Sequence, residues 1–175
     1  MNIAVFLDRD GVLNEAIVRD GRPYPPRSLS EFAIVPDARV VLDELHDAGY
    51  RLIVATNQPD VARGTATREQ VAELNQHLRS CLPVDAIEVC EHDDADACGC
   101  RKPEPGLLLR AAERDVIDLT RSFMIGDRWR DIEAGRRAGC RTVLIGNGYG
   151  ERFISQPDVA VRNLGEAARW IVSNH

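Results

Sequence analysis

Short apolar runs alternate with segments of helical periodicity along the whole chain. The runs at 2–7, 50–55, 86–89, 122–125 and 141–145 have the length and composition of buried strands, and 159–161 resembles a short edge strand. Helical patterns occupy 36–48, 67–81, 130–138 and 164–172, and another starts at 105. Such alternation builds a mainly parallel sheet with helices on both faces. We therefore predict an α/β fold, a Rossmann-like three-layer sandwich with a mainly parallel central sheet.

Local signals support two of the helix starts. Thr67 precedes a helical segment and Gln70 follows three residues later, which is the pattern of a capping box. Pro36-Asp37 is typical of the start of the first helix, and Gly49 of its end. The segment 14–35 is rich in Arg, Pro and Gly, and we expect it to be irregular.

The composition limits the compartment and the partners. The 175 residues, 44% hydrophobic and 29% charged, fit a single domain over 1–175. No apolar run approaches the roughly 20 residues that span a bilayer, and no secretory signal is visible, so we expect a cytoplasmic protein without membrane contact. A net charge of −6 argues against nucleic-acid binding. We expect a monomer.

Two acids follow the first predicted strand directly. Asp8 and Asp10 would lie at the carboxyl end of a parallel strand, where ligands bind in such sheets. Asp8 is the candidate nucleophile, which would form an acyl phosphate. Asp10 would donate a proton to the leaving oxygen and then accept one from water. A solvated acidic turn is the alternative, and three later fragments disfavour it: Thr56-Asn57-Gln58, Arg101-Lys102-Pro103 and Gly126-Asp127.

Each of these fragments offers a group that a phosphoryl transfer needs. The Thr56 hydroxyl would hold phosphate oxygens, although it could simply end a strand. Lys102 would oppose the negative charge of the transition state, although an isolated lysine is usually a surface residue. Asp127 would hold Mg²⁺ together with Asp8. Asp131 would bind a water of that ion, orient Arg128, or act only as an acid at a helix start.

The order Asp-x-Asp, Thr, Lys, Asp resembles the haloacid dehalogenase superfamily of phosphatases over about residues 3–146. The resemblance implies that Asp8 is the nucleophile, Asp10 the acid/base, and Thr56 and Lys102 the groups that steady the phosphoryl group. It also implies a Mg²⁺ site made by Asp8, the backbone carbonyl of Asp10, and Asp127. The intervals between these motifs leave no room for a separate cap domain, so we expect an open site shaped by loops near 15–27, 58–66 and 90–101.

A second cluster combines three cysteines with a histidine. Cys90, His92, Cys98 and Cys100 form a closed Cys₃His set that suits structural Zn²⁺, in a loop at about 90–101. Reduced surface cysteines or a redox pair are the alternatives, but C-x-C is not the usual redox spacing. Because the loop leads into Arg101-Lys102, zinc would fix the segment that carries the catalytic lysine.

This loop resembles a zinc-containing subgroup of the superfamily, which includes D-glycero-D-manno-heptose 1,7-bisphosphate 7-phosphatases and histidinol-phosphate phosphatases. The resemblance implies a Mg²⁺-dependent sugar-phosphate phosphatase, and Arg63-Gly64 favours the heptose enzymes. Removal of the 7-phosphate is therefore the expected activity, with histidinol-phosphate hydrolysis as the alternative. A non-catalytic zinc scaffold that binds phosphorylated ligands is the alternative from another class. The expected substrate contacts are Asn57, Gln58, Arg63, Arg101 and Arg128.

Overall fold

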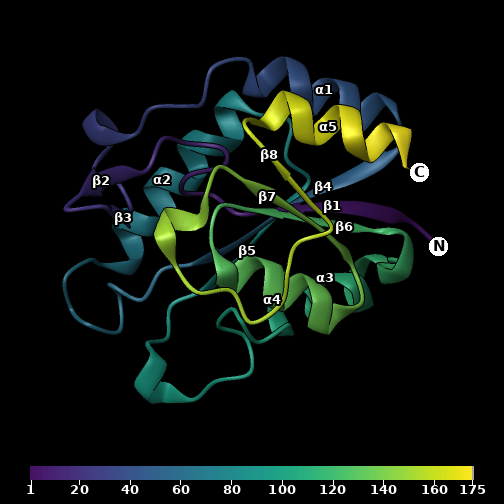
Figure 1. Cartoon of the computed structure of the whole chain (residues 1–175). Helices are drawn as coiled ribbons and strands as arrows, with labels where there is room; N and C mark the ends of the chain where they lie inside the picture. Colours follow the sequence, from purple (N-terminus) through teal and green to yellow (C-terminus); the bar gives the residue numbers. More distant parts are fainter. Residues whose placement is uncertain (175) are drawn as a thin grey trace.

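The computed structural model describes residues 1–174. Six strands form one parallel sheet in the order β5-β4-β1-β6-β7-β8 (Figure 1). The strands are β1 (Ile3–Leu7), β4 (Tyr50–Asn57), β5 (Ala86–Cys90), β6 (Phe123–Gly126), β7 (Arg141–Ile145) and β8 (Val159–Val161). All six lie at or within two residues of the predicted runs, so the predicted parallel sheet is confirmed.

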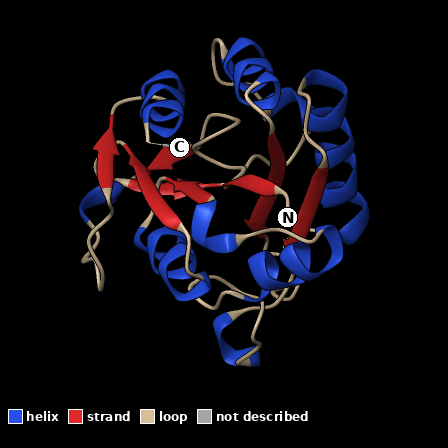
Figure 2. Cartoon of the chain, turned by 90° about the vertical axis from the view of Figure 1, so that its right-hand side faces the viewer, coloured by secondary structure: helices blue, strands red, loops and turns tan. Residues whose placement is uncertain are grey.

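Helices cover both faces of this sheet. They are α1 (Ala38–Asp47), α2 (Arg68–Cys81), α3 (Gly106–Asp115), α4 (Trp129–Ala138) and α5 (Leu164–Ser173). The apolar sides of α1, α2 and α5 pack on one face, and α3 packs on the other, beside α4. Viewed from the side, the strands lie between the two helical layers (Figure 2). The predicted three-layer sandwich is therefore confirmed.

The central strand β1 shows why both layers are needed. Val5 and Leu7 point into one apolar cluster, and Ala4 and Phe6 point into the other. All four side chains are fully buried. A strand that is covered on both faces needs a continuous apolar run rather than an alternating pattern, and 3–7 supplies that run.

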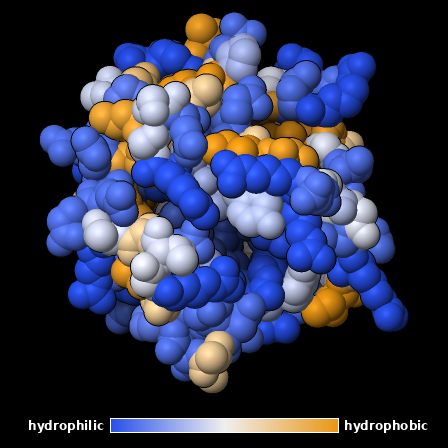
Figure 3. All heavy atoms as spheres, turned by 90° about the vertical axis from the view of Figure 1, so that its left-hand side faces the viewer, coloured by the Kyte–Doolittle hydropathy of each residue, from blue (hydrophilic) through white to orange (hydrophobic). Residues whose placement is uncertain are grey.

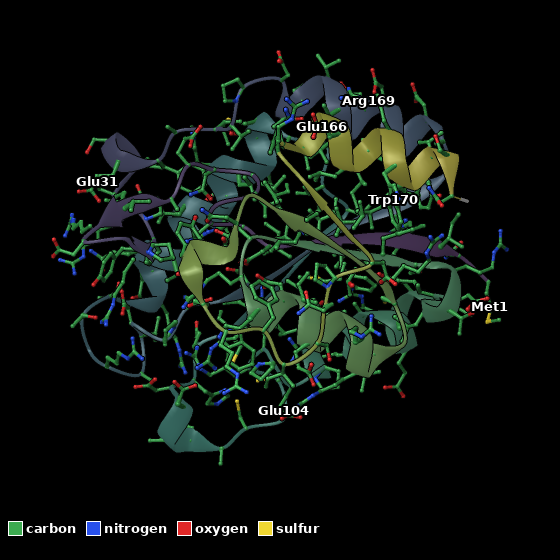
Figure 4. The ribbon with its side chains drawn as sticks, viewed as in Figure 1. Met1, Glu31, Glu104, Glu166, Arg169 and Trp170 are labelled. Atoms are coloured by element: carbon green, nitrogen blue, oxygen red, sulfur yellow. The ribbon has the colours of Figure 1, made fainter. Side chains whose placement is uncertain are left out.

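The ends of the helices follow from local signals. Thr67 Oγ1 accepts a hydrogen bond from the Gln70 N–H at 3.2 Å, and Gln70 Oε1 accepts one from the Thr67 N–H at 2.8 Å. The predicted capping box at the start of α2 is therefore confirmed. At the C-terminal end of the chain, Trp170 points from α5 toward the sheet (Figure 4) and makes an edge contact with Phe123 at 6.0 Å between ring centroids.

The prediction that 14–35 is wholly irregular is wrong. Residues Ile17–Arg19 (β2) and Arg22–Tyr24 (β3) form an antiparallel hairpin, and a single 3₁₀ turn follows at Leu29–Glu31. Asp20 (φ 50°) and Gly21 (φ 71°) make the two-residue turn between the strands. An Asp-Gly pair suits the left-handed conformations that a tight hairpin turn requires, so the signal was present in the sequence.

The path of the chain creates a switch point in the sheet. After β1 the chain proceeds to β4 and β5 on one side, and it then returns to place β6 on the other side of β1. The segments that leave β1 and β6 therefore run in opposite directions along the sheet. They leave a crevice beyond the carboxyl ends of these two strands, which is where open α/β sheets bind ligands. The described helices include none that is long and apolar enough to cross a membrane.

Candidate active site

Three carboxylates meet at this switch point. Asp8 follows β1, Asp127 follows β6, and Asp131 lies in the first turn of α4. Because Leu7 of β1 pairs with Ile125 of β6, the two strands end side by side. One oxygen from each of the three acids lies within 4.8 Å of the others. The structure thus brings Asp8 and Asp127 close enough to share an ion, and it adds Asp131.

The clustered acids repel one another in a buried environment. Burial and the charge of Asp131 raise the pKa of Asp8 to about 7, although Lys102 partly offsets this shift. Burial and the charge of Asp8 also hold the pKa of Asp127 well above its usual value. A site that disfavours its own negative charges in this way is suited to a cation, which would return the carboxylates to their ionised forms.

Lys102 supplies one positive charge from within the chain. Its ammonium group donates to Asp8 Oδ1 at 2.9 Å, to Asp131 Oδ1 at 2.6 Å and to the carbonyl of Ala55 at 2.7 Å. Burial alone would lower the Lys102 pKa, but the charges of Asp131 and Asp8 outweigh it and raise the pKa above its usual value. Lys102 is therefore a fixed cation that bridges two of the acids.

Asn57 holds the backbone of this lysine. Its amide Oδ1 accepts from the Lys102 N–H at 3.0 Å, and its Nδ2 donates to the Lys102 carbonyl at 3.0 Å. The end of β4 and the loop before α3 are thereby joined by two hydrogen bonds. The side-chain amide of Asn57 is thus engaged in positioning Lys102.

Asp10 is held by a shell of N–H donors. Its carboxylate accepts four hydrogen bonds, from Arg9 Nε and Nη2 at 3.1 Å each, Asn14 Nδ2 at 3.0 Å and Gln58 Nε2 at 2.8 Å. Arg9 is fully buried, and its Nη1 donates to Asn75 on α2 at 2.8 Å. The orientation of Asp10 is therefore fixed by the residue that precedes it and by α2.

Gln58 and Thr56 contact each other rather than the cavity. The Gln58 Nε2 that binds Asp10 also donates to Thr56 Oγ1 at 2.9 Å. Both side chains are buried. Gln58 therefore links Thr56, at the end of β4, to Asp10.

These groups open onto one cavity. Figure 3 faces the side of the β2–β3 hairpin, where a hollow is rimmed mostly by hydrophilic side chains. The cavity is lined by Asp8, Asp10, Pro23, Tyr24, Pro25, Asn57, Pro59, Asp60, Arg101, Lys102, Asp127, Arg128, Arg130 and Asp131. Of the predicted substrate contacts, Asn57, Arg101 and Arg128 are thus in the wall, whereas Gln58 and Arg63 are not.

Two arginines of the wall share one acid of the Cys/His loop. Asp94 Oδ1 accepts from Arg101 Nε at 2.9 Å and from Arg130 Nη1 at 2.9 Å. The side chain of Arg101 is only 10% exposed, and its Nη1 is buried without a hydrogen-bond partner. Arg101 therefore retains an unused donor beside the cavity.

The other two predicted arginines are also bound by acids. Asp93 accepts from Arg63 Nε at 2.8 Å and from its Nη2 at 2.6 Å. Glu151 accepts from Arg128 Nε at 3.1 Å and from its Nη2. Arg63 is thus tied to the Cys/His loop, whereas Arg128 is held in the wall of the cavity.

The Cys/His cluster has the dimensions of a zinc site. Cys100 Sγ lies 3.2 Å from Cys90 Sγ and 3.5 Å from Cys98 Sγ, and the sulfurs of Cys90 and Cys98 lie 3.7 Å apart. His92 Nδ1 lies 3.5 Å from Cys90 Sγ and 3.4 Å from Cys100 Sγ. A tetrahedral zinc ion with Zn–S bonds of about 2.3 Å separates its sulfur ligands by roughly 3.8 Å. The four side chains would therefore need only small shifts to hold zinc.

The thiols of this cluster cannot all ionise without a cation. Burial and the Cys100 thiol raise the pKa of Cys90 to about 12. Burial also opposes ionisation of Cys98, but backbone hydrogen bonds from Arg101 and Cys100 outweigh it and lower its pKa to about 7. Ionisation of one thiol therefore opposes ionisation of its neighbours. Zn²⁺, which binds thiolates, fits this donor set.

The carboxylate cluster likewise fits Mg²⁺. Asp127 Oδ1 is buried without a hydrogen-bond partner, while Oδ2 accepts from the Tyr149 hydroxyl at 2.8 Å. A Cβ on Gly11 would lie 1.9 Å from Asp127 Oδ2, so only glycine leaves room for this carboxylate. An unused carboxylate oxygen beside Asp8 is the kind of ligand that hard cations prefer.

Comparison with known proteins identifies the family. Residues 99–167 match a family model described as HAD-hydrolase-like. The chain is 34% identical to a D-glycero-D-manno-heptose-1,7-bisphosphate 7-phosphatase of Thermosynechococcus vestitus, over 98% of this chain and 96% of that protein. It is 33% identical to a D-glycero-beta-D-manno-heptose-1,7-bisphosphate 7-phosphatase of Helicobacter pylori, over 97% of each. The chain belongs to the HAD-like phosphatase family.

A solved structure agrees with this assignment. The D,D-heptose 1,7-bisphosphate phosphatase from B. bronchiseptica, crystallised with magnesium and phosphate, superimposes with a TM-score of 0.86. It is 29% identical in sequence, and the match covers 100% of both chains. The predicted resemblance to the haloacid dehalogenase superfamily is thus confirmed, as is the predicted fold.

Several residues of this HAD-like site were not predicted from the sequence. Arg9 holds Asp10, Asp94 links two arginines, Tyr149 contacts Asp127, and Glu151 binds Arg128. The position of Arg9 between two acids was a usable signal, since a buried pair needs a counter-charge. Tyr149 and Glu151 lie far along the chain in a turn after β7, and no local pattern connects them with β6.

Proposed function

We propose that this chain is a Mg²⁺-dependent phosphatase that removes the 7-phosphate of D-glycero-D-manno-heptose 1,7-bisphosphate through an aspartyl-phosphate on Asp8. The observation that carries the proposal is the meeting of Asp8, Lys102 and Asp127 at the switch point of the sheet. The named activity of the relatives, which match over nearly their whole length, supports the choice of substrate.

In the first step, a carboxylate oxygen of Asp8 attacks the phosphorus in line with the leaving oxygen. Lys102 Nζ, already 2.9 Å from Asp8 Oδ1, opposes the negative charge on the phosphoryl group. Thr56 and backbone N–H groups after β4 would hold the other phosphate oxygens. Mg²⁺, held by Asp8, Asp127 and the backbone carbonyl of Asp10, would supply positive charge beside the phosphate and favour ionised Asp8.

Asp10 handles the proton in both steps. It donates to the leaving sugar oxygen and then takes a proton from the water that hydrolyses the acyl phosphate. Its hydrogen bonds to Arg9, Asn14 and Gln58 keep the carboxylate in one orientation, so proton transfer does not wait for a side-chain rotation. Asp131 acts through Lys102, since it accepts from both Lys102 Nζ and the Arg128 N–H.

We assign a structural role to Zn²⁺ bound by Cys90, His92, Cys98 and Cys100. Four protein ligands leave no open position for substrate. The loop carries Asp94, which orients Arg101, and it leads into Lys102. Zinc would thus act on catalysis through the placement of these two cations.

The remaining assignments concern the substrate and the state of the protein. Arg101 and Arg128 line the cavity and would contact the second phosphate or the sugar hydroxyls, with Asn57 beside them. Gln58 and Arg63 would contribute through their neighbours. We further propose a single catalytic domain over 1–175 without a cap, which works as a cytoplasmic monomer.

A substrate panel tests the proposal. Phosphate release from heptose 1,7-bisphosphate and from histidinol phosphate should be compared as kcat/KM with Mg²⁺ present. A clear preference for the heptose is expected, together with loss of turnover in Asp8→Asn. Equal or faster turnover of histidinol phosphate would overturn the choice of substrate. Retained turnover in Asp8→Asn would instead favour the non-catalytic zinc scaffold, with the turnover coming from a contaminating enzyme.

A further inference from the structure

The turn after β7 carries a tyrosine to the proposed Mg²⁺ site. The Tyr149 hydroxyl donates to Asp127 Oδ2 at 2.8 Å. The other oxygen of the same carboxylate, Oδ1, is buried and has no hydrogen-bond partner. We propose that Tyr149 is a positioning residue that fixes Asp127 so that Oδ1 is presented to Mg²⁺. This inference rests on the function proposed above.

The two oxygens of Asp127 thereby have different tasks. A carboxylate without a partner can rotate about its Cβ–Cγ bond and present either oxygen. With Oδ2 bound to Tyr149, the plane of the carboxylate is set before the ion arrives. Partners of this kind commonly orient metal ligands, and their loss typically weakens metal binding by about 10- to 100-fold.

The backbone around Tyr149 is built to keep it in place. Tyr149 adopts a left-handed conformation (φ 54°, ψ 27°), which is uncommon for a residue with a side chain. It lies between Gly148 (φ 66°) and Gly150 (φ 71°), which adopt this region without steric cost. Asn147 Oδ1 accepts from the Tyr149 N–H at 3.0 Å and so supports the turn. Such strain persists only where the surroundings enforce it, and it clusters at functional sites.

One glycine makes room for the contact between Tyr149 and Asp127, and a second lies in the turn itself. A Cβ on Gly11 would lie 1.9 Å from Asp127 Oδ2 and 3.3 Å from the Tyr149 hydroxyl. A Cβ on Gly148 would lie 2.5 Å from the ring of Phe153. Gly11 follows Asp10 directly, so the glycine after the two acids opens the space in which Tyr149 and Asp127 meet. Gly148 thus lets the ring of Phe153 pack closely against the same turn.

The same turn also carries Glu151, which allows an internal comparison with Tyr149. Glu151, two residues after Tyr149, binds the guanidinium of Arg128, whereas Tyr149 binds Asp127. If each residue positions its own partner, loss of Tyr149 should weaken Mg²⁺ binding, and loss of Glu151 should weaken substrate binding. A turn that merely packs against the domain would not separate these two effects.

Tyr149→Phe tests the proposal, with Tyr24→Phe as the matched control. Both tyrosines line a second hollow that shares Tyr24 and Arg128 with the cavity, but the contact with Asp127 belongs to Tyr149. Mg²⁺ binding to the full-length, zinc-loaded protein should be measured by titration calorimetry in buffer freed of Mg²⁺ on a chelating resin. Tyr149→Phe should weaken Mg²⁺ binding about 10-fold or more, with an unchanged melting temperature before Mg²⁺ is added. Tyr24→Phe should bind Mg²⁺ like the wild type.

Wild-type Mg²⁺ affinity in Tyr149→Phe would overturn the inference, as would an equal loss in Tyr24→Phe. If Tyr149→Phe does not fold, Tyr149→Asn serves instead, because asparagine tolerates the left-handed backbone and cannot reach Asp127. Asn should show the same loss of affinity, and a normal affinity would overturn the inference. Loss of the folded state in both variants would also overturn it. Because ion binding is read directly, a failure of heptose hydrolysis in the wild type would count against the proposed function alone.

Discussion

Replacing Asp8, the proposed nucleophile, should make the Mg²⁺-free protein more stable. Burial, followed by the charge of Asp131, raises the pKa of Asp8 from 3.8 to about 7. Each pKa unit corresponds to about 1.4 kcal/mol, so keeping Asp8 ionised in the folded chain costs about 4 kcal/mol above pH 7. Asp8→Asn removes this cost but weakens the contacts with Lys102 and the Arg9 N–H. The net expected gain is about 2 to 4 kcal/mol.

The sign of this effect depends on pH. A raised carboxyl pKa means that the folded chain holds a proton which the unfolded chain releases. Stability from Asp8 is thus complete below pH 3.8 and is lost as the pH rises through about 7. The advantage of Asp8→Asn should therefore be largest at pH 8 and small at pH 4. At roughly 2 to 4 °C per kcal/mol, the melting temperature at pH 8 should rise by about 5 to 15 °C.

Thermal unfolding at pH 4 and pH 8 measures this difference, in buffer from which Mg²⁺ but not zinc has been removed. Asp43→Asn is the control, because Asp43 is 48% exposed and forms only a surface pair with Arg39. It should change stability by less than about 0.5 kcal/mol at either pH. The reasoning is refuted if Asp8→Asn is no more stable than the wild type at pH 8, or if its gain is the same at both pH values.

Three further outcomes are expected. Arg9→Lys keeps the charge but loses the two-pronged contact with Asp10, so kcat should fall about 10-fold or more, as a kcat/KM assay with a folding control would show. Glu151→Gln should raise KM while the Mg²⁺ affinity measured by calorimetry stays constant, because Arg128 alone loses its partner. Removing zinc with a strong chelator should lower both turnover and the melting temperature, and added Zn²⁺ should restore both; unchanged turnover in demonstrably zinc-free protein would contradict the role given to the loop.

The fold was predictable because its periodicity is local. A buried parallel strand such as 3–7 reads as a continuous apolar run, and the capping box at Thr67 is complete within four residues. The β2–β3 hairpin was missed because its strands are three residues each and partly exposed, so hydrophobicity gives no signal. Only its Asp20-Gly21 turn carried the information.

The charged groups of the candidate site could be predicted from the sequence, but the residues that hold them in place could not. Asp8 and Asp127 directly follow strands, and Lys102 lies in the loop four residues before α3. Parallel topology gathers such positions at one edge of the sheet. Which partner each group binds depends on side-chain directions that no spacing encodes. Thus Gln58 was expected to touch substrate, whereas its amide binds Asp10 and Thr56. Tyr149 approaches Asp127 only because β7 lies next to β6.

The acyl phosphate on Asp8 is the most direct test of the account. Protein mixed with heptose 1,7-bisphosphate and Mg²⁺ should be quenched in acid within milliseconds and digested. The masses of its peptides should then be measured by mass spectrometry. The account predicts one peptide heavier by a single phosphoryl group, with the label on Asp8, and no label in Asp8→Asn. Phosphate release in the first turnover without any labelled peptide, or a label on a different residue, would contradict it.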